Sequence, residues 1–503
     1  MQLPDTIDGL HPFSTAIERN LRSKTYRKPA NNSKPPPNAP NIAKPRKKVL
    51  LADTIGQSLC LRRTHLSPTN EPPTLPHIQD LVTRLQPDES LSPWLSVPVD
   101  RHGPYASTSS ETLTENSYDT ALWYSSNTSG ESEKSGSAGV SDKGSPYNRI
   151  VSLGGKPSEQ DVERLATEYG LPSQMGLLDP SYHVFINQDC TAGLCFKVLN
   201  RVAVIIGDPM CELGRISNLL REFKEHRRRK HWGMSVLGAG EPLAQYAREN
   251  KRWTVLRFGK NQVLNPLTNE VIHETSGKRI LTQARQLLNP AKGGLTLDLY
   301  IPSLHGTDYK LENHLGTVYE AWRGVRNASC KPQAFITEYD PFMMPNLMTY
   351  IYSRDLDGTV NGFTALRWVG AKGGFHVDPC IAAPGAQRGI SDLLLFASMA
   401  YSRQLGISYL GVGYEPSESI SGDSKLSSRV ERLTSRLYRY TYWRLPLMGK
   451  GAYFKKFKPD AEEDSPVYLI FCSKIPGPRQ GAALLHVAHI SLRRLLLDRT
   501  AED

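Results

Sequence analysis

The feature of this sequence that most restricts its fold is an internal repeat. Two stretches far apart in the chain each carry Asp-Pro, then a segment with helical spacing of apolar residues, then the pattern Gly-x-Ser-x-Leu-Gly. The first copy starts at Asp208 and reaches its glycine pattern at Gly233; the second starts at Asp378 and reaches it at Gly406. Because the motifs recur in the same order and at similar distances, the sequence predicts a duplicated structural unit.

Short apolar runs separated by turn residues surround each copy. Residues 184–187 and 195–199 predict a hairpin, and residues 350–353 and 363–368 flank an Asp-Gly turn in the second copy. The helix in each copy carries an apolar face, formed by Ile216, Leu219, Leu220 and Phe223 in the first and by Ile390, Leu393, Leu394, Ala397 and Tyr401 in the second. This β-β-β-α-β order is the core of the N-acetyltransferase-like (GNAT) fold. We therefore expect an α/β (α+β) protein with tandem GNAT domains and mixed β-sheets.

The composition changes near residue 147 and divides the chain into four expected parts. Residues 1–146 are rich in Pro, Ser, Thr and Gly and are expected to form a disordered tail. The tandem domains are expected at residues 147–300 and 301–475, followed by a basic helix or tail at residues 476–503. Residues 47–53 are basic and then apolar, which fits a docking peptide or a chance apolar cluster, and we favour the chance cluster.

The bulk composition narrows the compartment and the partners. The formal net charge of +11 favours nucleic acid or a membrane surface as partner, although basic tails alone could carry the excess. The seven cysteines form no CxxC pair and the histidines lack metal-ligand spacing, so we expect a reducing compartment and no metal site. The sequence has no apolar run of roughly 18 residues and no signal-peptide core. We expect a cytoplasmic protein, associated peripherally with a membrane.

Several stretches, taken in order, resemble one known family. They are residues 175–179 (Met-Gly-Leu-Leu-Asp), 207–209 (Gly-Asp-Pro), 256–259 (Leu-Arg-Phe-Gly), 277–279 (Gly-Lys-Arg), 377–379 (Val-Asp-Pro) with Gly389 and Asp392, and 456–459 (Lys-Phe-Lys-Pro). Together they resemble the C-terminal catalytic domain of the bacterial phosphatidylglycerol lysyltransferases, the multiple peptide resistance factors. The resemblance runs from about residue 147 to about residue 473 and implies transfer of an amino acid from aminoacyl-tRNA to a lipid.

The sequence departs from the bacterial pattern in two ways. The family has an arginine three residues after the position of Asp378, where this chain has Ile381, and a disordered tail stands where the bacterial enzymes carry a membrane-embedded flippase. The soluble form is similar to the free-standing fungal relatives, the ergosteryl-aspartate synthases, which carry a fused synthetase, and the unfused ergosteryl-glycine synthase. Since no synthetase module is visible, the resemblance implies transfer of glycine from glycyl-tRNA to the 3-hydroxyl of ergosterol, with aminoacyl-tRNA as co-substrate and no further cofactor.

Three alternatives remain open at this stage. The acceptor could be phosphatidylglycerol, with lysine or alanine as the transferred group. The chain could instead be an acetyl-CoA-dependent GNAT acetyltransferase. A third alternative is a non-enzymatic scaffold that binds RNA or a phosphatase through its tail.

The resemblance points to two catalytic residues. An acyl transfer between oxygens needs two substrates held together, a proton acceptor and a stabilised oxyanion. Asp378, at the end of a predicted strand, could anchor the amino group or act as base; alternatively it is a turn residue before Pro379. Lys456 could stabilise the oxyanion or contact the tRNA terminus; alternatively it belongs to a solvated basic run.

Four further residues are expected to bind substrate. Arg388 and Gly389 open a helix and could hold a phosphate, although an ordinary helix start fits equally well. Asp392 belongs to the motif that carries the resemblance. His376 would share the face of the strand that carries Asp378, although a satisfied core histidine fits it better.

Two basic strips are candidates for tRNA binding. Arg227, Arg228, Arg229 and Lys230 end a predicted helix, where cations also complement the helix dipole. Lys278, Arg279 and Arg285 form the second strip at helical spacing.

Two further segments could contact lipid. One interleaves aromatic residues with arginines: Tyr438, Tyr440, Tyr442 and Trp443 with Arg436, Arg439 and Arg444. It could line a lipid entry, or it could be a helix packed on the core with its arginines outward. The second is residues 484–497, an imperfectly amphipathic stretch that could lie on a membrane surface.

Overall fold

The computed structural model describes residues 49–61, 76–85, 149–153, 159–328, 340–422, 428–445 and 448–490. Its first strands are β1 (Arg149–Ser152), β2 (His183–Ile186), β3 (Gly193–Leu199), β4 (Val202–Ile206) and β5 (Gly233–Ala239). A second set comprises β7 (Thr296–Tyr300), β8 (Met348–Arg354), β9 (Val360–Val369), β10 (Gly374–Ala382) and β11 (Leu410–Gly422). Between the two sets lie β12 (Ser465–Phe471) and β6 (Thr254–Leu264). We call β1 to β5 the first half and β7 to β11 the second half.

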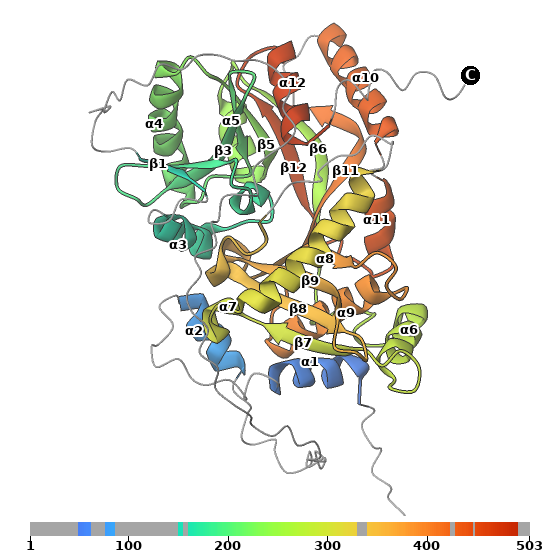
Figure 1. The fold of residues 1–503 in the computed structure, drawn as a ribbon. Coiled ribbons are helices and arrows are strands. Elements are labelled where there is room, and N and C mark those ends of the chain that lie inside the picture. Colours follow the sequence, from blue (N-terminus) through green and yellow to red (C-terminus); the bar gives the residue numbers. More distant parts are fainter. Residues whose placement is uncertain are drawn as a thin grey trace, which may run out of the picture. The chain divides into compact units, whose positions relative to one another are not determined.

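All these strands form one mixed sheet, in the order β1-β2-β3-β4-β5-β12-β6-β11-β10-β9-β8-β7 (Figure 1). Starting from either edge, three antiparallel pairings are followed by one parallel pairing, β4 with β5 or β10 with β11. The pairings therefore read the same from both edges, which confirms the predicted duplication and the mixed α/β class.

The two halves exchange a strand at the centre of the sheet. The late strand β12 pairs with β5 of the first half, and the earlier β6 pairs with β11 of the second half. β12 and β6 also pair with each other, which joins the halves into one continuous sheet. β6 and β7 both precede residue 301, yet they pair with strands that follow it.

The crossover helices fill the positions that the periodicity predicts. α4 (Ile216–Arg229) connects β4 to β5 and buries Ile216, Leu219, Leu220 and Phe223, the predicted face. α9 (Ile390–Gln404) connects β10 to β11 and is buried on nearly all sides from Leu393 to Ser402. The remaining helices are α3 (Glu159–Tyr169), α5 (Glu241–Glu249), α6 (Lys278–Leu288), α7 (Pro302–His305), α8 (Tyr309–Asn327), α10 (Ser428–Arg444), α11 (Met448–Lys455) and α12 (Pro478–Val487).

Two helices lie within the segment expected to be a disordered tail, α1 (Leu51–Leu61) and α2 (Pro76–Leu85). α1 packs on α9 and buries Ala52, Ile55 and Leu59, and Gly56 allows the close approach because a Cβ there would stand 2.8 Å from the Ala400 carbonyl oxygen. Because α1 packs on α9, the interpretation of residues 47–53 as a chance cluster was wrong. The helical signal was weak because the apolar residues recur over only about three turns. Residues 1–48, 62–75 and 86–148 lie outside the described residues.

Candidate active site

The second half opens between its two parallel strands. The pairing of β10 with β11 is confined to Phe375 with Leu410 and His376 with Gly411, and beyond these residues β10 pairs with β9 while β11 pairs with β6. In the first half, β4 and β5 stay paired over the whole of β4. An irregularity in β10 lies at this opening and contains Asp378 and Pro379, between Val377 and Cys380. Because a bulge re-aims side chains, it separates Asp378 from the regular alternation of the strand.

Side chains from β10, from α9 and from the segment after α11 lie beside this opening. Lys456, which follows α11, places its Nζ 2.5 Å from Oδ1 of Asp392 in the first turn of α9. The same ammonium lies 4.0 Å from the centroid of the Tyr453 ring. Cys380 in β10 donates its thiol hydrogen to the Ser391 carbonyl oxygen, 3.4 Å away, which ties the strand to the start of α9.

The Cys380 thiol lies near enough to several charged groups for them to affect its pKa. Burial raises the pKa of the Cys380 thiol to about 12; the Asp392 and Asp378 carboxylates add to the rise and the Lys456 ammonium opposes it. Asp378, Asp392 and Lys456 therefore all act on one point, although they are distant in sequence. A thiol with so high a pKa stays protonated at neutral pH, which makes Cys380 a poor nucleophile.

Tyr453 adds a proton donor to the site. Burial raises the pKa of its phenol far above the ordinary value, and Cys380 and the Asp392 carboxylate raise it further. The phenol therefore keeps its hydrogen at any physiological pH.

The structure gives His376 and Gly389 positioning roles. His376 is buried, and its Nδ1 donates to the Gly411 carbonyl oxygen at 3.1 Å, on the last rung before the strands separate. Gly389 caps α9 with φ of +97°, and a Cβ there would stand 2.2 Å from Nε2 of Gln283. That amide donates to the Arg388 carbonyl oxygen at 2.7 Å, while the Arg388 side chain is exposed.

The two basic strips lie on different halves. Arg228, Arg229 and Lys230 are exposed at the end of α4, whereas Arg227 is half-buried and donates to the Trp232 carbonyl oxygen at 3.0 Å. Burial lowers the pKa of the Arg227 guanidinium. Through its hydrogen bond to Trp232, Arg227 stabilises the end of α4.

The second strip lies on α6, which packs on α9 and adjoins the opening. Lys278 and Arg279 are exposed, and Arg285 pairs with Glu274 at 2.7 Å. The same carboxylate oxygen of Glu274 accepts the backbone N–H of Leu51 at the start of α1. Gln283 on the same helix holds the loop before α9, so this strip is the one connected to the charged cluster.

A large apolar cavity of about 660 Å³ lies where the halves meet, between α10, α12 and the strands β5, β6 and β12. Both sequence candidates for lipid contact contribute to it: Tyr438, Tyr440 and Tyr442 of the aromatic run, and Leu484, Leu485 and Ile490 of the segment at residues 484–497, of which residues 491–497 lie outside the described residues. The Tyr438 hydroxyl hydrogen-bonds to the Ser417 carbonyl oxygen at 2.7 Å, which anchors α10 to β11. Among the described residues, none that lines this cavity is charged.

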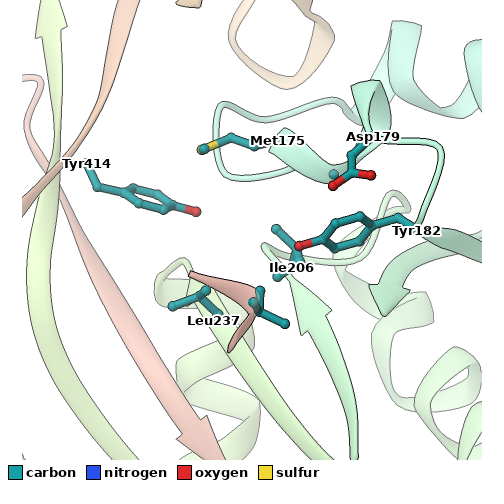
Figure 2. A pocket seen from close by; sticks show the side chains of 8 residues that line it. Met175, Asp179, Tyr182, Ile206, Leu237 and Tyr414 are labelled. Carbon is teal, nitrogen blue, oxygen red and sulfur yellow. The ribbon is translucent and has the colours of Figure 1, made fainter. Parts of the chain in front are cut away.

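A second, water-sized cavity of about 20 Å³ was not anticipated from the sequence. Figure 2 shows Tyr414 of β11 entering it from the side opposite Met175, Asp179 and Tyr182. Three of these residues belong to or follow the motif at residues 175–179, and Tyr414 also donates to the Ser173 carbonyl oxygen at 3.1 Å. The motif therefore joins the first half to β11 of the second half, and the cavity is too small for a substrate.

Asp208, the counterpart of Asp378 in the first half, connects two neighbouring strands. It is buried and its Oδ1 accepts the Gly240 N–H at 2.9 Å, which ties the end of β4 to the end of β5. Burial raises the pKa of this carboxyl from 3.8 to about 6, and the hydrogen bond from Gly240 opposes the rise.

The described parts of the chain contain no group of three or more His, Cys, Asp or Glu side chains placed to hold a metal ion. None of their helices has the length and apolar character needed to cross a bilayer.

Comparison with known proteins gives one family. The family model for the C-terminal region of phosphatidylglycerol lysyltransferase matches residues 170–471. No curated protein sequence matches the chain.

Among solved structures, L-PGS from Bacillus licheniformis shares 16% identity at a TM-score of 0.49, over 66% of this chain and 96% of that chain. The C-terminal domain (DUF2156) of an Agrobacterium fabrum protein, provisionally described as a lysylphosphatidylglycerol synthetase, shares 18% identity at a TM-score of 0.48, over 66% and 92%. A tandem GNAT protein from the clavulanic acid biosynthesis pathway shares 9% identity at a TM-score of 0.29, over 66% and 99%.

The duplicated sheet, opened in one half beside a charged cluster, defines a two-part α/β protein. The chain belongs to the phosphatidylglycerol lysyltransferase C-terminal family, because the family model matches more than half of its residues. Membership supports an aminoacyltransferase that takes its amino acid from aminoacyl-tRNA and gives it to a lipid.

Proposed function

We propose that this protein transfers glycine from glycyl-tRNA to the 3-hydroxyl of a membrane sterol, at the cytoplasmic surface of a membrane. The proposal is carried by the apolar cavity of about 660 Å³, whose described lining residues include no charged side chain. A phosphatidylglycerol headgroup brings a phosphate whose burial needs a cation, whereas a sterol brings an apolar ring system and one hydroxyl. Ile381, at the position of the family arginine, is buried in β10 and supplies no cation either.

In the proposed reaction, the sterol oxygen attacks the ester carbonyl carbon of the aminoacyl-tRNA. A new ester C–O bond forms, the bond to the ribose oxygen breaks, and the proton of the sterol hydroxyl ends on that ribose oxygen. The donor ester is already activated, so no ATP is consumed. The site has to orient the two substrates, relay one proton and stabilise one transient negative charge.

The charged cluster supports a division of these tasks. Asp378, at the opening, binds the ammonium group of the glycyl ester or receives the proton of the attacking hydroxyl. Lys456 stabilises the oxyanion with its ammonium, held in place by Asp392 at 2.5 Å. Tyr453 supplies a hydroxyl that stays protonated beside them.

The α6 strip is the better candidate for the tRNA acceptor end. It is connected through Gln283 to the loop before α9, and Lys278 and Arg279 form no ion pair among the described residues. Phosphates bound there would place the 3′ terminus toward the opening between β10 and β11. The α4 strip lies on the other half and is left for a more distant part of the tRNA. The choice of glycine as amino acid is supported by the resemblance to the unfused fungal branch.

Filling the cavity without disturbing the fold tests the acceptor site. Gly481 lies in α12 and lines the cavity, and a Cβ added there meets no atom within 4 Å. Gly481→Phe should raise KM for the sterol by about tenfold or more, because the added ring occupies the space of the acceptor. Gly324→Phe is the matched control: it lies in helix α8, has equally open surroundings and does not line the cavity.

The assay follows labelled glycine from glycyl-tRNA into lipid, with sterol-containing or phosphatidylglycerol-containing vesicles and without acetyl-CoA. The proposal predicts label in sterol only. Label in phosphatidylglycerol, or a requirement for acetyl-CoA, would establish one of the two enzymatic alternatives. Removal of residues 1–48, which keeps α1, should leave transfer intact; loss of all function would favour the scaffold alternative.

A further inference from the structure

The outer face of α10 exposes large apolar side chains to solvent. Leu433 and Leu437 are each 60% exposed, Trp443 is 57% exposed and Tyr440 is 38% exposed. Ile475, in the segment before α12, is 57% exposed. Scattered single apolar residues need no explanation on a protein surface, but five that gather on one helix and its neighbouring segment do. We call these five residues the apolar rim.

The apolar rim surrounds an opening of the large cavity. Leu433, Leu437, Tyr440 and Ile475 line the cavity and are also exposed to solvent, so the cavity communicates with the outside along α10. Figure 1 shows α10 and α12 as neighbouring helices on this side of the sheet. A ligand that enters here passes over leucine, isoleucine and aromatic side chains.

Cations flank the apolar rim. Arg436 and Arg439 are exposed on α10, and neither forms an ion pair or a side-chain hydrogen bond among the described residues. The Arg444 guanidinium lies 4.7 Å from the centroid of the Tyr440 ring. These arginines alternate with the apolar residues, so headgroup contacts and apolar insertion can occur on the same face.

A second hollow of about 520 Å³ lies on the other side of α12 and contains Arg201, Arg479 and His486. It shares Pro478 and Ala482 with the apolar cavity, so the two hollows meet along this helix. Neither arginine has an acidic partner among the described residues. One side of α12 therefore faces apolar space and the other faces a basic groove.

We propose that the apolar rim, together with Arg436, Arg439 and the basic groove beside α12, docks the protein on an anionic lipid bilayer. Leucine and tryptophan side chains insert at the boundary between headgroups and acyl chains, while arginines contact lipid phosphates. RNA would use the arginines and the aromatic rings but has no use for exposed leucines, so the bilayer accounts for more of the face. The inference deepens the proposed function, on which it rests for one consequence: the sterol passes from the bilayer into the cavity without crossing water.

Vesicle sedimentation of the full chain tests the docking face. The vesicles are pure phosphatidylcholine, or phosphatidylcholine in which about one lipid in three is phosphatidylserine. Trp443→Ser and the pair Arg436→Gln with Arg439→Gln should each lower binding to the anionic vesicles by about tenfold. None of these three residues lines the cavity. The matched controls are Tyr309→Ser, an aromatic residue 75% exposed on α8, and Arg221→Gln with Lys224→Gln, two exposed cations at the same spacing on α4.

The result expected is loss of binding in the α10 variants and wild-type binding in the controls. If the double variants on α10 and on α4 lose vesicle binding equally, net charge alone attracts the protein and the proposal is overturned. Equal binding of the wild-type protein to neutral and anionic vesicles would also overturn it. Binding of the α10 face to tRNA in place of vesicles would assign the surface to RNA. Glycine transfer to sterol dispersed in detergent separates the docking proposal from the proposed function. If the α10 variants transfer glycine to sterol in detergent but not to sterol in vesicles, both the docking proposal and the proposed function are supported. If the wild-type protein binds vesicles but transfers no glycine, only the proposed function is contradicted.

Discussion

The two copies of the repeated unit place the same dipeptide in opposite surroundings. Asp208 is enclosed at the end of β4, where it accepts the Gly240 N–H and holds a closed pair of strands together. Asp378 lies in a bulge of β10, where the parallel strands separate, and it affects the pKa of Cys380 together with Asp392 and Lys456. Duplication thus gives one half whose Asp-Pro is part of the scaffold and one half whose Asp-Pro lies at an opening. The contrast leads to four predictions about the two copies.

The largest difference is expected in activity. Asp378→Asn removes the proposed anchor or base and should lower kcat by a factor on the order of 10²–10⁴. Asp208→Asn should leave kcat within a few-fold of wild type, because that residue contacts no substrate. The measurement is transfer of labelled glycine to sterol by both variants, with circular dichroism to show that each is folded. Equal losses in the two variants would end the distinction between the halves.

Lys456 sharpens the account of the opened half. Lys456→Ala should lower kcat about 10²–10³-fold with little change in KM, because an oxyanion forms only in the transition state. Asp392→Asn should have a smaller effect in the same direction, since it positions the ammonium and leaves it in place. Steady-state kinetics with varied sterol provide the test; a change confined to KM would move Lys456 from the chemistry to substrate binding.

The buried Asp208 of the first half should make the stability of the protein depend on pH. Burial raises the pKa of Asp208 from 3.8 to about 6, so between these values the folded protein holds a proton that the unfolded chain has lost. The contribution of this group to stability is therefore full at low pH and falls as pH rises to about 6. Asp208→Asn mimics the protonated group and should be more stable than wild type at pH 7 by about 3 kcal/mol, since one pKa unit is worth about 1.4 kcal/mol.

Denaturant unfolding of both proteins at pH 4 and pH 7 measures this difference. The two curves should agree at the lower pH and separate at the higher one. A variant less stable than wild type at pH 7 would show that the ionised carboxylate is needed for the hydrogen bond to Gly240.

The smallest effect concerns the helices of the two copies. α9 is covered by α1, whereas α4 exposes a basic face. Gly56→Ala places a Cβ 2.8 Å from the Ala400 carbonyl oxygen and should destabilise the protein by about 1–3 kcal/mol. Gly214→Ala, just before α4, meets no atom within 4 Å and serves as control. Thermal unfolding checks the pair; equal midpoints would mean that α1 adds little to α9.

The repeat, the strands around it and the buried faces of both helices were predictable, because apolar spacing reports local structure directly. The exchange of β6 and β12 was not, since both are apolar antiparallel strands and their partners depend on contacts far away in sequence. Asp378, Asp392 and Lys456 were named through family resemblance, whereas no motif or spacing indicated that Cys380 and Tyr453 lie near them. The cavity was hidden because its lining comes from strands and helices of both halves, and the leucines of α10 resemble an ordinary packed face.

The central claim is best tested by the mass of the lipid product. Purified protein is incubated with glycyl-tRNA and vesicles that contain both sterol and phosphatidylglycerol. The lipids are then extracted and their masses are measured by mass spectrometry. The account predicts a sterol that has gained one glycyl residue, formed by wild type and by Asp208→Asn but not by Asp378→Asn. A glycyl or other aminoacyl group on phosphatidylglycerol, with the sterol unchanged, would contradict it.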